Sequence, residues 1–185
     1  GVRVKINSLK VEIEDETLKH KIRSYFNTTY FNPKKIEVSM GKTKKLLKSL
    51  HYYFPEIELK KNYLGNRKER IDLLVKVNAG YKYVFRFIGM RDRMSIIDGA
   101  WKNKVFEKFA LKESETKLLN YLFTKGYLQA TIRSEIIDSE DGIKTIVFYV
   151  RKRDKYFLNK ISFIGNRSIS NSRIRQVINS DKLLY

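Results

Sequence analysis

The sequence predicts an α+β fold built as a tandem repeat, in which each unit runs strand, helix, helix, strand, strand. Three observations lead to this prediction. Apolar and polar residues alternate over some segments as in strands, apolar residues recur at helical spacing in others, and the whole order occurs twice. A strand and a helix after the second unit repeat the start of that order, so we expect the chain to be part of a longer array.

Composition and charge narrow the classes of function. The apolar share is 42%, and no run approaches the roughly 18 apolar residues of a membrane-spanning helix. Because the sequence has no cysteine, disulfides and thiolate metal sites are excluded. The 39 Lys and Arg exceed the 20 Asp and Glu, a formal net charge of +19. The excess is spread along the chain, which predicts a basic surface and leaves nucleic acid and anionic lipid headgroups as alternative ligands.

The first unit is expected to span residues 1–80. Strand periodicity runs over residues 2–13 with one slip of phase near Asn7-Ser8, which indicates a bulge. Asp15 is the candidate cap of a first helix. A second helix follows the break at Asn32-Pro33, and two alternating strands joined by a hairpin complete the unit. The residues that we expect the second helix to carry into the core are Leu46, Leu47, Leu50 and Tyr53.

The second unit is expected to span residues 81–154 and to open with a strand over 81–89. Trp101, Val105 and Phe109 follow at a spacing of four, which predicts a first helix with Trp101 as a core anchor.

The second helix of this unit is predicted to end at Gly126, a residue suited to a left-handed C-cap. Strands are expected over 128–138 and 143–150. Between them, Asp141-Gly142 is a strong hairpin signal.

A nearly constant offset relates the units. Residues 51–57 align with 126–132 at an offset of 75, and the predicted strand FRFIG at 85–89 matches ISFIG at 161–165 at an offset of 76. Two separate landmarks with almost one period indicate a structural repeat. Residues 155–185 are therefore predicted to begin an incomplete third unit.

This repeat resembles the POTRA domain. The resemblance is carried by Gly126-Tyr127 at the end of a helix, by the hairpin strands that follow, and by the motif I-x-F-x-G-N at 161–166 before a helix capped by Ser170. It covers the whole chain, as two complete units and an incomplete third. In the first unit, His51 stands where glycine is usual. The resemblance implies, in each unit, a three-stranded mixed sheet with two helices packed on one face.

The resemblance also implies a function, that of the periplasmic arm of an outer-membrane β-barrel protein of the BamA and TamA superfamily. In that superfamily POTRA repeats precede a C-terminal membrane barrel, which we expect to be missing from this chain. They receive unfolded outer-membrane proteins, or bind periplasmic partner proteins, and aid insertion into the outer membrane. Alternative functions are a two-partner secretion transporter and a nucleic-acid-binding array.

Strand edges are the sites that this architecture offers. The resemblance implies that the second strand of each unit lies at a sheet edge, where N–H and C=O groups can pair with an extended segment of another chain. A client that will itself form a β-barrel supplies such segments. The residues expected to bind them are Glu56, Ile57, Glu58, Leu59, Leu128, Gln129, Ala130, Thr131, Ile132 and Arg133.

Patterns for catalysis and metal binding are weak. His20 and His51 are the only histidines, and the acidic run over 12–16 is typical of a helix N-terminus. The segment DSEDG at 138–142 lacks the spacing of a calcium loop, and no nucleophile-elbow or phosphate-loop motif occurs. We therefore expect a protein without enzymatic activity or cofactor. Proteins are the expected partners, and nucleic acid is disfavoured.

Overall fold

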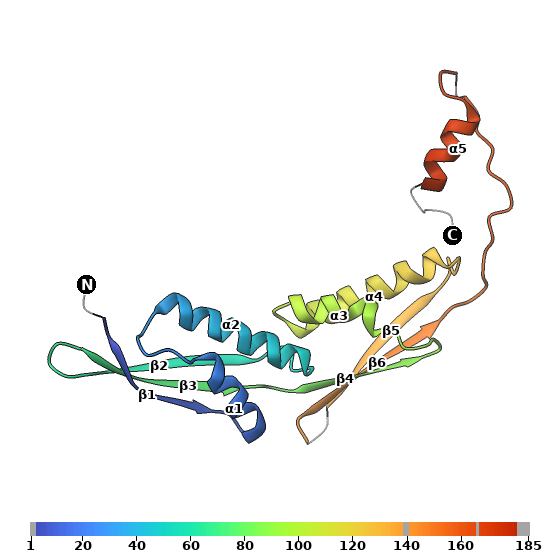
Figure 1. Cartoon of the computed structure of the whole chain (residues 1–185). Helices are drawn as coiled ribbons and strands as arrows, with labels where there is room; N and C mark the ends of the chain where they lie inside the picture. The colour runs from blue at the N-terminus through green and yellow to red at the C-terminus, as the bar shows by residue number, and fades with distance from the viewer. Residues whose placement is uncertain (1–2, 139–140, 166, 181–185) are drawn as a thin grey trace. The chain divides into compact units, whose positions relative to one another are not determined.

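The computed structural model describes residues 3–138, 141–165 and 167–180 (Figure 1). It contains two three-stranded sheets. By its contacts the chain divides into two compact bodies, one formed by Gly1–Val84 with Asp138–Thr145 and the other by Phe85–Ile137 with Ile146–Tyr185.

The first sheet contains β1 (Lys5–Glu12), β2 (Glu56–Leu64) and β3 (Arg70–Asn78) in the order β1-β3-β2. The central strand β3 runs parallel to β1 and antiparallel to β2, so the sheet is mixed. Helices α1 (Glu16–Tyr25) and α2 (Pro33–Ser49) pack on one face of it. Alternate residues of β3 define that face by joining both helices in one core cluster: Ile71, Leu73, Val75 and Val77.

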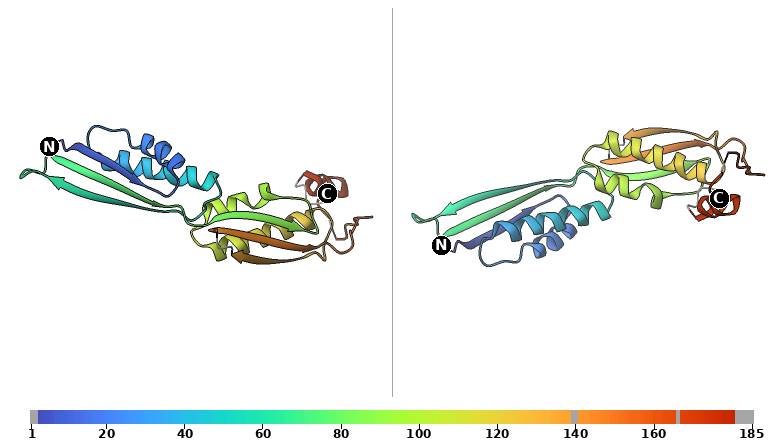
Figure 2. Two further views of the ribbon diagram at one scale, coloured as in Figure 1. Left: turned by 90° about the horizontal axis from the view of Figure 1, so that it is seen from below. Right: turned by 90° about the horizontal axis from the view of Figure 1, so that it is seen from above.

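The second sheet contains β4 (Lys82–Ile88), β5 (Thr131–Asp138) and β6 (Ile143–Arg151) in the order β4-β6-β5. The third strand of the repeat is again central. Figure 2 shows α3 (Met94–Asn103) and α4 (Glu107–Thr124) on one side of this sheet. Two contacts fix them there: Trp101 meets the edge of Phe85 with ring centroids 5.0 Å apart, and the Ser134 hydroxyl donates to Glu115.

The two cores repeat residue by residue, which confirms the predicted tandem fold. Buried residues that recur at an offset of 75 include Ile22 and Ile97, Phe26 and Trp101, Ser39 and Ser114, Leu47 and Leu122, and Ile71 and Ile146. Both buried serines donate to the carbonyl four residues earlier, Ser39 to Lys35 at 2.9 Å and Ser114 to Ala110 at 2.7 Å. Ser114 also accepts the indole N–H of Trp101 at 2.9 Å, so this polar group is satisfied inside the core.

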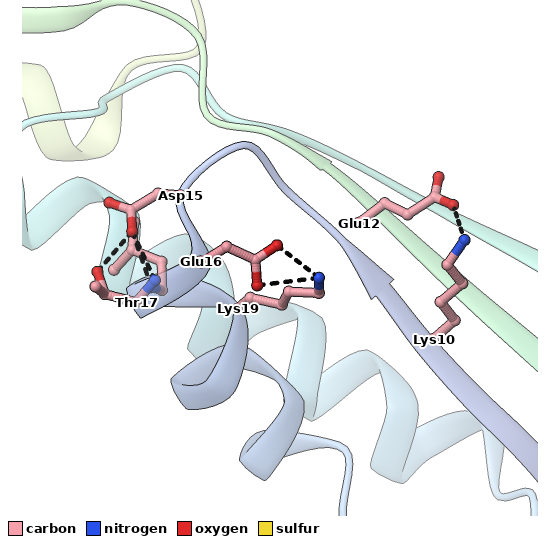
Figure 3. A network of polar contacts seen from close by, with 7 residues as sticks. Lys10, Glu12, Asp15, Glu16, Thr17 and Lys19 are labelled. Carbon is pink, nitrogen blue, oxygen red and sulfur yellow. Dashed lines mark hydrogen bonds and ion pairs between the residues drawn. The ribbon is translucent and has the colours of Figure 1, made fainter.

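The bulge in β1 and the cap of α1 lie where the sequence predicts them. The register of β1 against β3 shifts between Ile6 and Ser8, at the predicted bulge. The Asp15 carboxylate accepts the N–H groups of Thr17 at 2.9 Å and Leu18 at 3.2 Å and so caps α1 (Figure 3). A bond from the Thr17 hydroxyl, followed by these amides, holds the pKa of Asp15 below its ordinary value, because all of them stabilise the ionised form.

The prediction of one helix through Trp101, Val105 and Phe109 was wrong, because the chain leaves the helix at Lys104. The backbone of Lys104 is extended, with φ −83° and ψ 154°, and its ammonium pairs with Glu113 at 2.8 Å. Trp101 is fully buried, as expected of a core anchor, whereas Val105 and Phe109 are 75% and 60% exposed. Apolar spacing alone could not show that the chain turns between two helices.

The prediction for the end of α2 was also partly wrong. The helix ends at Ser49, and Leu50 is 39% exposed rather than in the core. Leu47 is buried as expected. Tyr53 is buried too, but it enters the core from the loop, after His51 has turned the chain with φ +71°.

Residues 161–165, predicted as a strand, form no regular structure. In both sheets the first strand is bonded to the third, and the described residues beyond β6 contain no strand that could serve as that partner. The helix predicted after Ser170 is present as α5 (Asn171–Ser180).

A left-handed residue follows the second helix of each repeat. Gly126 has φ +87°, and His51, at the matching position, has φ +71°. The next amide in each case bonds back across the helix end, Tyr127 to the Leu122 carbonyl and Tyr52 to the Leu47 carbonyl, both at 3.0 Å. This is the bond of a Schellman motif.

Glycine is required at position 126 for a second reason. A Cβ there would lie 2.5 Å from the carbonyl oxygen of Tyr156. We therefore expect Gly126→Ala to lower the free energy of unfolding by about 2–4 kcal/mol, the sum of left-handed strain and overlap with backbone. Urea denaturation followed by circular dichroism measures this loss.

Gly65→Ala is the matched control, because Gly65 has φ +81° with no atom within 4 Å of the added Cβ. It should cost only the strain, about 1 kcal/mol. Equal losses in the two variants would contradict the role given to the Tyr156 contact.

The Asp15 cap predicts that the stability of the folded chain depends on pH. Since the pKa of Asp15 is lowered in the folded chain, its stabilisation is fully present above the unfolded value of about 3.9 and is lost as the pH falls through the folded pKa. Asp15→Ala should therefore lower Tm at pH 7, and the gap to the parent should narrow below about pH 4. Glu14→Ala, at the preceding exposed position, is the control. A gap that stays constant down to pH 2 would count against the cap.

Candidate peptide-binding strand edges

The second strand of each repeat lies at a sheet edge, as expected. β2 is bonded to β3 and β5 to β6, and in the described part of the chain no strand is bonded to the other side of either. Alternate residues of an edge strand point their N–H and C=O groups outward. Both strands therefore present a row of backbone donors and acceptors to an incoming extended segment.

The edge formed by β1 differs from that of β2, because the chain itself covers part of it. The amide of Ile6 donates to the Thr29 carbonyl at 2.9 Å, and the amide of Phe31 donates to the Val4 carbonyl at 2.8 Å. An isolated bridge also joins Lys5 to Tyr30. Within the first sheet, β2 is thus the edge better placed to accept another strand.

The four predicted residues of the first edge begin β2. Ile57 and Leu59 are half-buried and pack against the core cluster, whereas Glu56 and Glu58 are exposed. This alternation places the two glutamates on the face of the sheet opposite the helices. An added strand would therefore meet charged neighbours on one face and apolar neighbours on the other.

Of the six residues predicted for the second edge, three lie in β5 and three do not. Thr131, Ile132 and Arg133 begin the strand. Leu128, Gln129 and Ala130 precede it in a turn, in which the Ala130 amide donates to the Tyr127 carbonyl at 3.1 Å. The prediction of a strand from 128 was wrong, because the Schellman closure at Gly126 is followed at once by this second turn. The offset of 75 from the start of β2 points to Thr131 and could have located the boundary.

The exposed face of the first sheet is polar. Asp72 of β3 accepts bonds from the Asn7 amide at 2.8 Å and the Ser8 hydroxyl at 2.6 Å. The bond from Ser8, and after it the bond from Asn7, lowers the pKa of Asp72. The bulge in β1 thus brings two donors to one carboxylate.

The same face of the second sheet carries an aromatic residue that sequence reasoning missed. The Tyr149 hydroxyl of β6 donates to Glu135 of β5 at 3.1 Å, and this bond raises the pKa of Tyr149. The Arg133 guanidinium lies 5.1 Å from the centroid of the Tyr149 ring, within cation–π distance. Together these contacts order the side chains next to the open edge of β5.

A shallow pocket lies where β5 begins and β6 ends, with a volume of about 420 Å³. Sequence reasoning found its β5 residues but not those from β4 and β6, because their proximity depends on the strand register. The lining residues are Ile88, Thr131, Ile132, Arg133, Tyr149, Val150 and Arg151.

Within residues 3–138, 141–165 and 167–180, no three His, Cys, Asp or Glu side chains gather closely enough to hold a metal ion. Over the same residues, no helix combines the length and apolar character needed to span a bilayer.

The chain is similar to known proteins both in sequence and in structure. No family model matches the chain. The chain is 22% identical over 201 residues to the outer membrane protein assembly factor BamA of Buchnera aphidicola subsp. Acyrthosiphon pisum (strain APS), an alignment that covers 96% of this chain and 32% of that protein. The chain thus spans about a third of the length of this relative.

Two solved structures are similar at low identity. BamA POTRA3-5 of Haemophilus influenzae gives a TM-score of 0.44 at 18% identity, over 94% of this chain and 76% of that one. The N-terminal domain of Omp85 from Thermosynechococcus elongatus gives a TM-score of 0.42 at 10% identity, over 79% of this chain and 62% of that one.

The fold and the sequence similarity agree. Each repeat has the order strand, helix, helix, strand, strand, with its third strand central in a three-stranded sheet and its two helices on one face. The similarity to BamA extends over nearly the whole chain. The two repeated units have the POTRA-type fold that the sequence predicted, and the chain is similar in sequence to BamA.

Proposed function

We propose that this chain is the periplasmic POTRA region of an outer-membrane protein that assembles or exports other proteins. The similarity to BamA supports this role, because BamA is by name an outer-membrane assembly factor and the alignment covers 96% of this chain. In this proposal the POTRA units span residues 1–80 and 81–154, and residues 155–185 begin a third.

The geometry before and within α5 supports a third unit. Gly89 and Gly165 have almost the same left-handed conformation, with φ +87° and +88°. Each precedes a helix of ten residues, α3 and α5, and α1 in the first unit has the same length.

The proposed activity is the binding of extended segments of client or partner proteins by strand addition to β2 and β5. The observation that carries it is the pair of edge strands, each bonded on one side to a central strand. Bonds to the backbone tolerate many sequences, which suits a receptor for diverse unfolded clients. Residues Glu56, Ile57, Glu58 and Leu59 of β2, and Thr131, Ile132 and Arg133 of β5, would form the contact.

A titration followed by amide NMR shifts tests this proposal. An extended peptide of alternating threonine and valine should shift the amides of 56–62 or 131–136, because these residues would gain hydrogen bonds to the added strand. The matched control is the same peptide N-methylated at alternate residues, which removes the donors on one edge but keeps the side chains. It should produce no shifts in these segments.

A titration with a short RNA at physiological salt tests the alternative function, nucleic-acid binding. Shifts that arise only with RNA, centred on the basic clusters 42–45 and 151–155, would replace strand addition with nucleic-acid binding. Equal shifts with the methylated and unmodified peptides would also contradict strand addition, because side chains alone would then explain the binding.

A further inference from the structure

Lys61 of the edge strand β2 lies on the helix-side face of the first sheet, the face on which α1 and α2 pack. It is directly opposite Leu73 of β3 in the antiparallel register, and Leu73 is buried in the core cluster. Residues directly opposite each other on neighbouring strands point to the same face. Leu59, two residues earlier, is half-buried against this cluster, whereas Lys61 is exposed. The helix-side face of β2 therefore changes from apolar to basic between these two residues.

The charge of Lys61 lies over an aromatic ring. Its ammonium is 5.2 Å from the centroid of Phe31, within cation–π distance. Phe31 comes just before α2 and packs partly buried against the core cluster. In the described part of the chain, no carboxylate oxygen lies within 4.0 Å of this ammonium. The inward direction of Lys61 is thus shown twice, by the strand register and by its contact with Phe31.

An inward-pointing lysine opposes the addition of a strand. A strand added to β2 would bring a side chain within about 5 Å of the Cβ of Lys61 on the same face. The earlier residues of that face, Ile57 and Leu59, are apolar and favour a segment with an apolar face. Such a segment would take water away from the ammonium without offering it a hydrogen bond, which costs free energy. Natural sheets use inward-pointing charges in this way to protect their edges.

The matching position of the second unit is apolar. The offset of 75 that relates the first residues of β2 and β5 carries Lys61 onto Ile136, which is half-buried. The Ser134 hydroxyl donates to Glu115 of α4, so Ser134 points toward the helices. By alternation, Ile132 and Ile136 lie on the same face. From Ile132 to Ile136, the helix-side face of β5 therefore carries no charged residue.

We propose that Lys61 stops strand addition to β2 beyond its first residues, whereas β5 accepts an extended segment with an apolar face through Ile136. This inference rests on the proposed strand addition and assigns contacts of different length to the two edges. The first unit would bind a client only over the start of β2. The second unit would bind it along most of β5. Lys61 is then the residue that directs segments with an apolar face to the second unit.

Amide NMR shifts show where an added strand ends. The extended peptide of alternating threonine and valine presents a valine face and is titrated into the intact chain. In the parent chain, shifts should cover 131–136 and should not reach 61–63. Lys61→Ile gives β2 the residue that β5 has at the matching position. In this variant the shifts should extend through 61–63, and the Kd for β2 should fall about fivefold, because an apolar cross-strand pair replaces a desolvated charge.

Three further variants separate the inward charge of Lys61 from basic charge in general. Lys60→Ile is the matched control, because Lys60 is the preceding residue of β2 and lies opposite Leu74, on the other face of the sheet. It loses the same charge and gains the same side chain, yet it should not extend the shifts. Lys61→Arg keeps the inward charge and should leave the shifts as in the parent. The reverse change, Ile136→Lys, should raise the Kd for β5 about fivefold.

The possible failures are distinguishable. If the peptide shifts the amides of neither 56–59 nor 131–136 in any of these proteins, strand addition is wrong, and this inference falls with it. If the shifts in the parent already run through 61–63, or if Lys61→Ile leaves 61–63 unshifted while β5 responds, strand addition stands and the role of Lys61 is wrong. Equal extension of the shifts in Lys61→Ile and Lys60→Ile would also overturn the proposal, because the direction of the side chain would then not matter.

Discussion

Each repeat depends on its central third strand. Along β3, alternate side chains enter the core beneath two helices, while the backbone is bonded on both sides, to β1 and to β2. With only three strands, one central strand leaves two edges in every sheet. Helices on one face cover side chains but do not cap these edges, so the open backbone of β2 and β5 follows from the architecture itself.

The core repeats more strictly than the surface. A buried serine, a buried aromatic residue and a left-handed turn recur at the same offset, although the aromatic residue is Phe26 in one repeat and Trp101 in the other. Close packing limits change at such positions, because a misfit costs stability wherever it occurs. Side chains on the exposed sheet face are free of that limit, and there the two repeats carry different charges.

That difference shows how one architecture can hold two kinds of edge. Lys76 pairs with Glu12 within the first sheet, whereas Arg133 of the second sheet lies over the Tyr149 ring. The backbone of an edge strand gives general affinity for extended chains, and the flanking side chains set which chains are preferred.

The repeat, the order of its elements and the fold could be predicted from the amino-acid sequence alone. Periodicity, the Asp15 cap and the Gly126 turn are signals between residues close in the chain, and they were enough for these conclusions. Features that depend on contacts between distant segments could not be predicted in this way. The helix breaks at Lys104 because the chain turns there, and β5 starts late because the closure at Gly126 is followed by a second turn. Residues 161–165 form no strand because a partner strand is missing from the described part of the chain. The local spacing of apolar residues encodes none of these features. The meeting of Arg133 with Tyr149 belongs to the same class, because strand register brings these residues of two strands together.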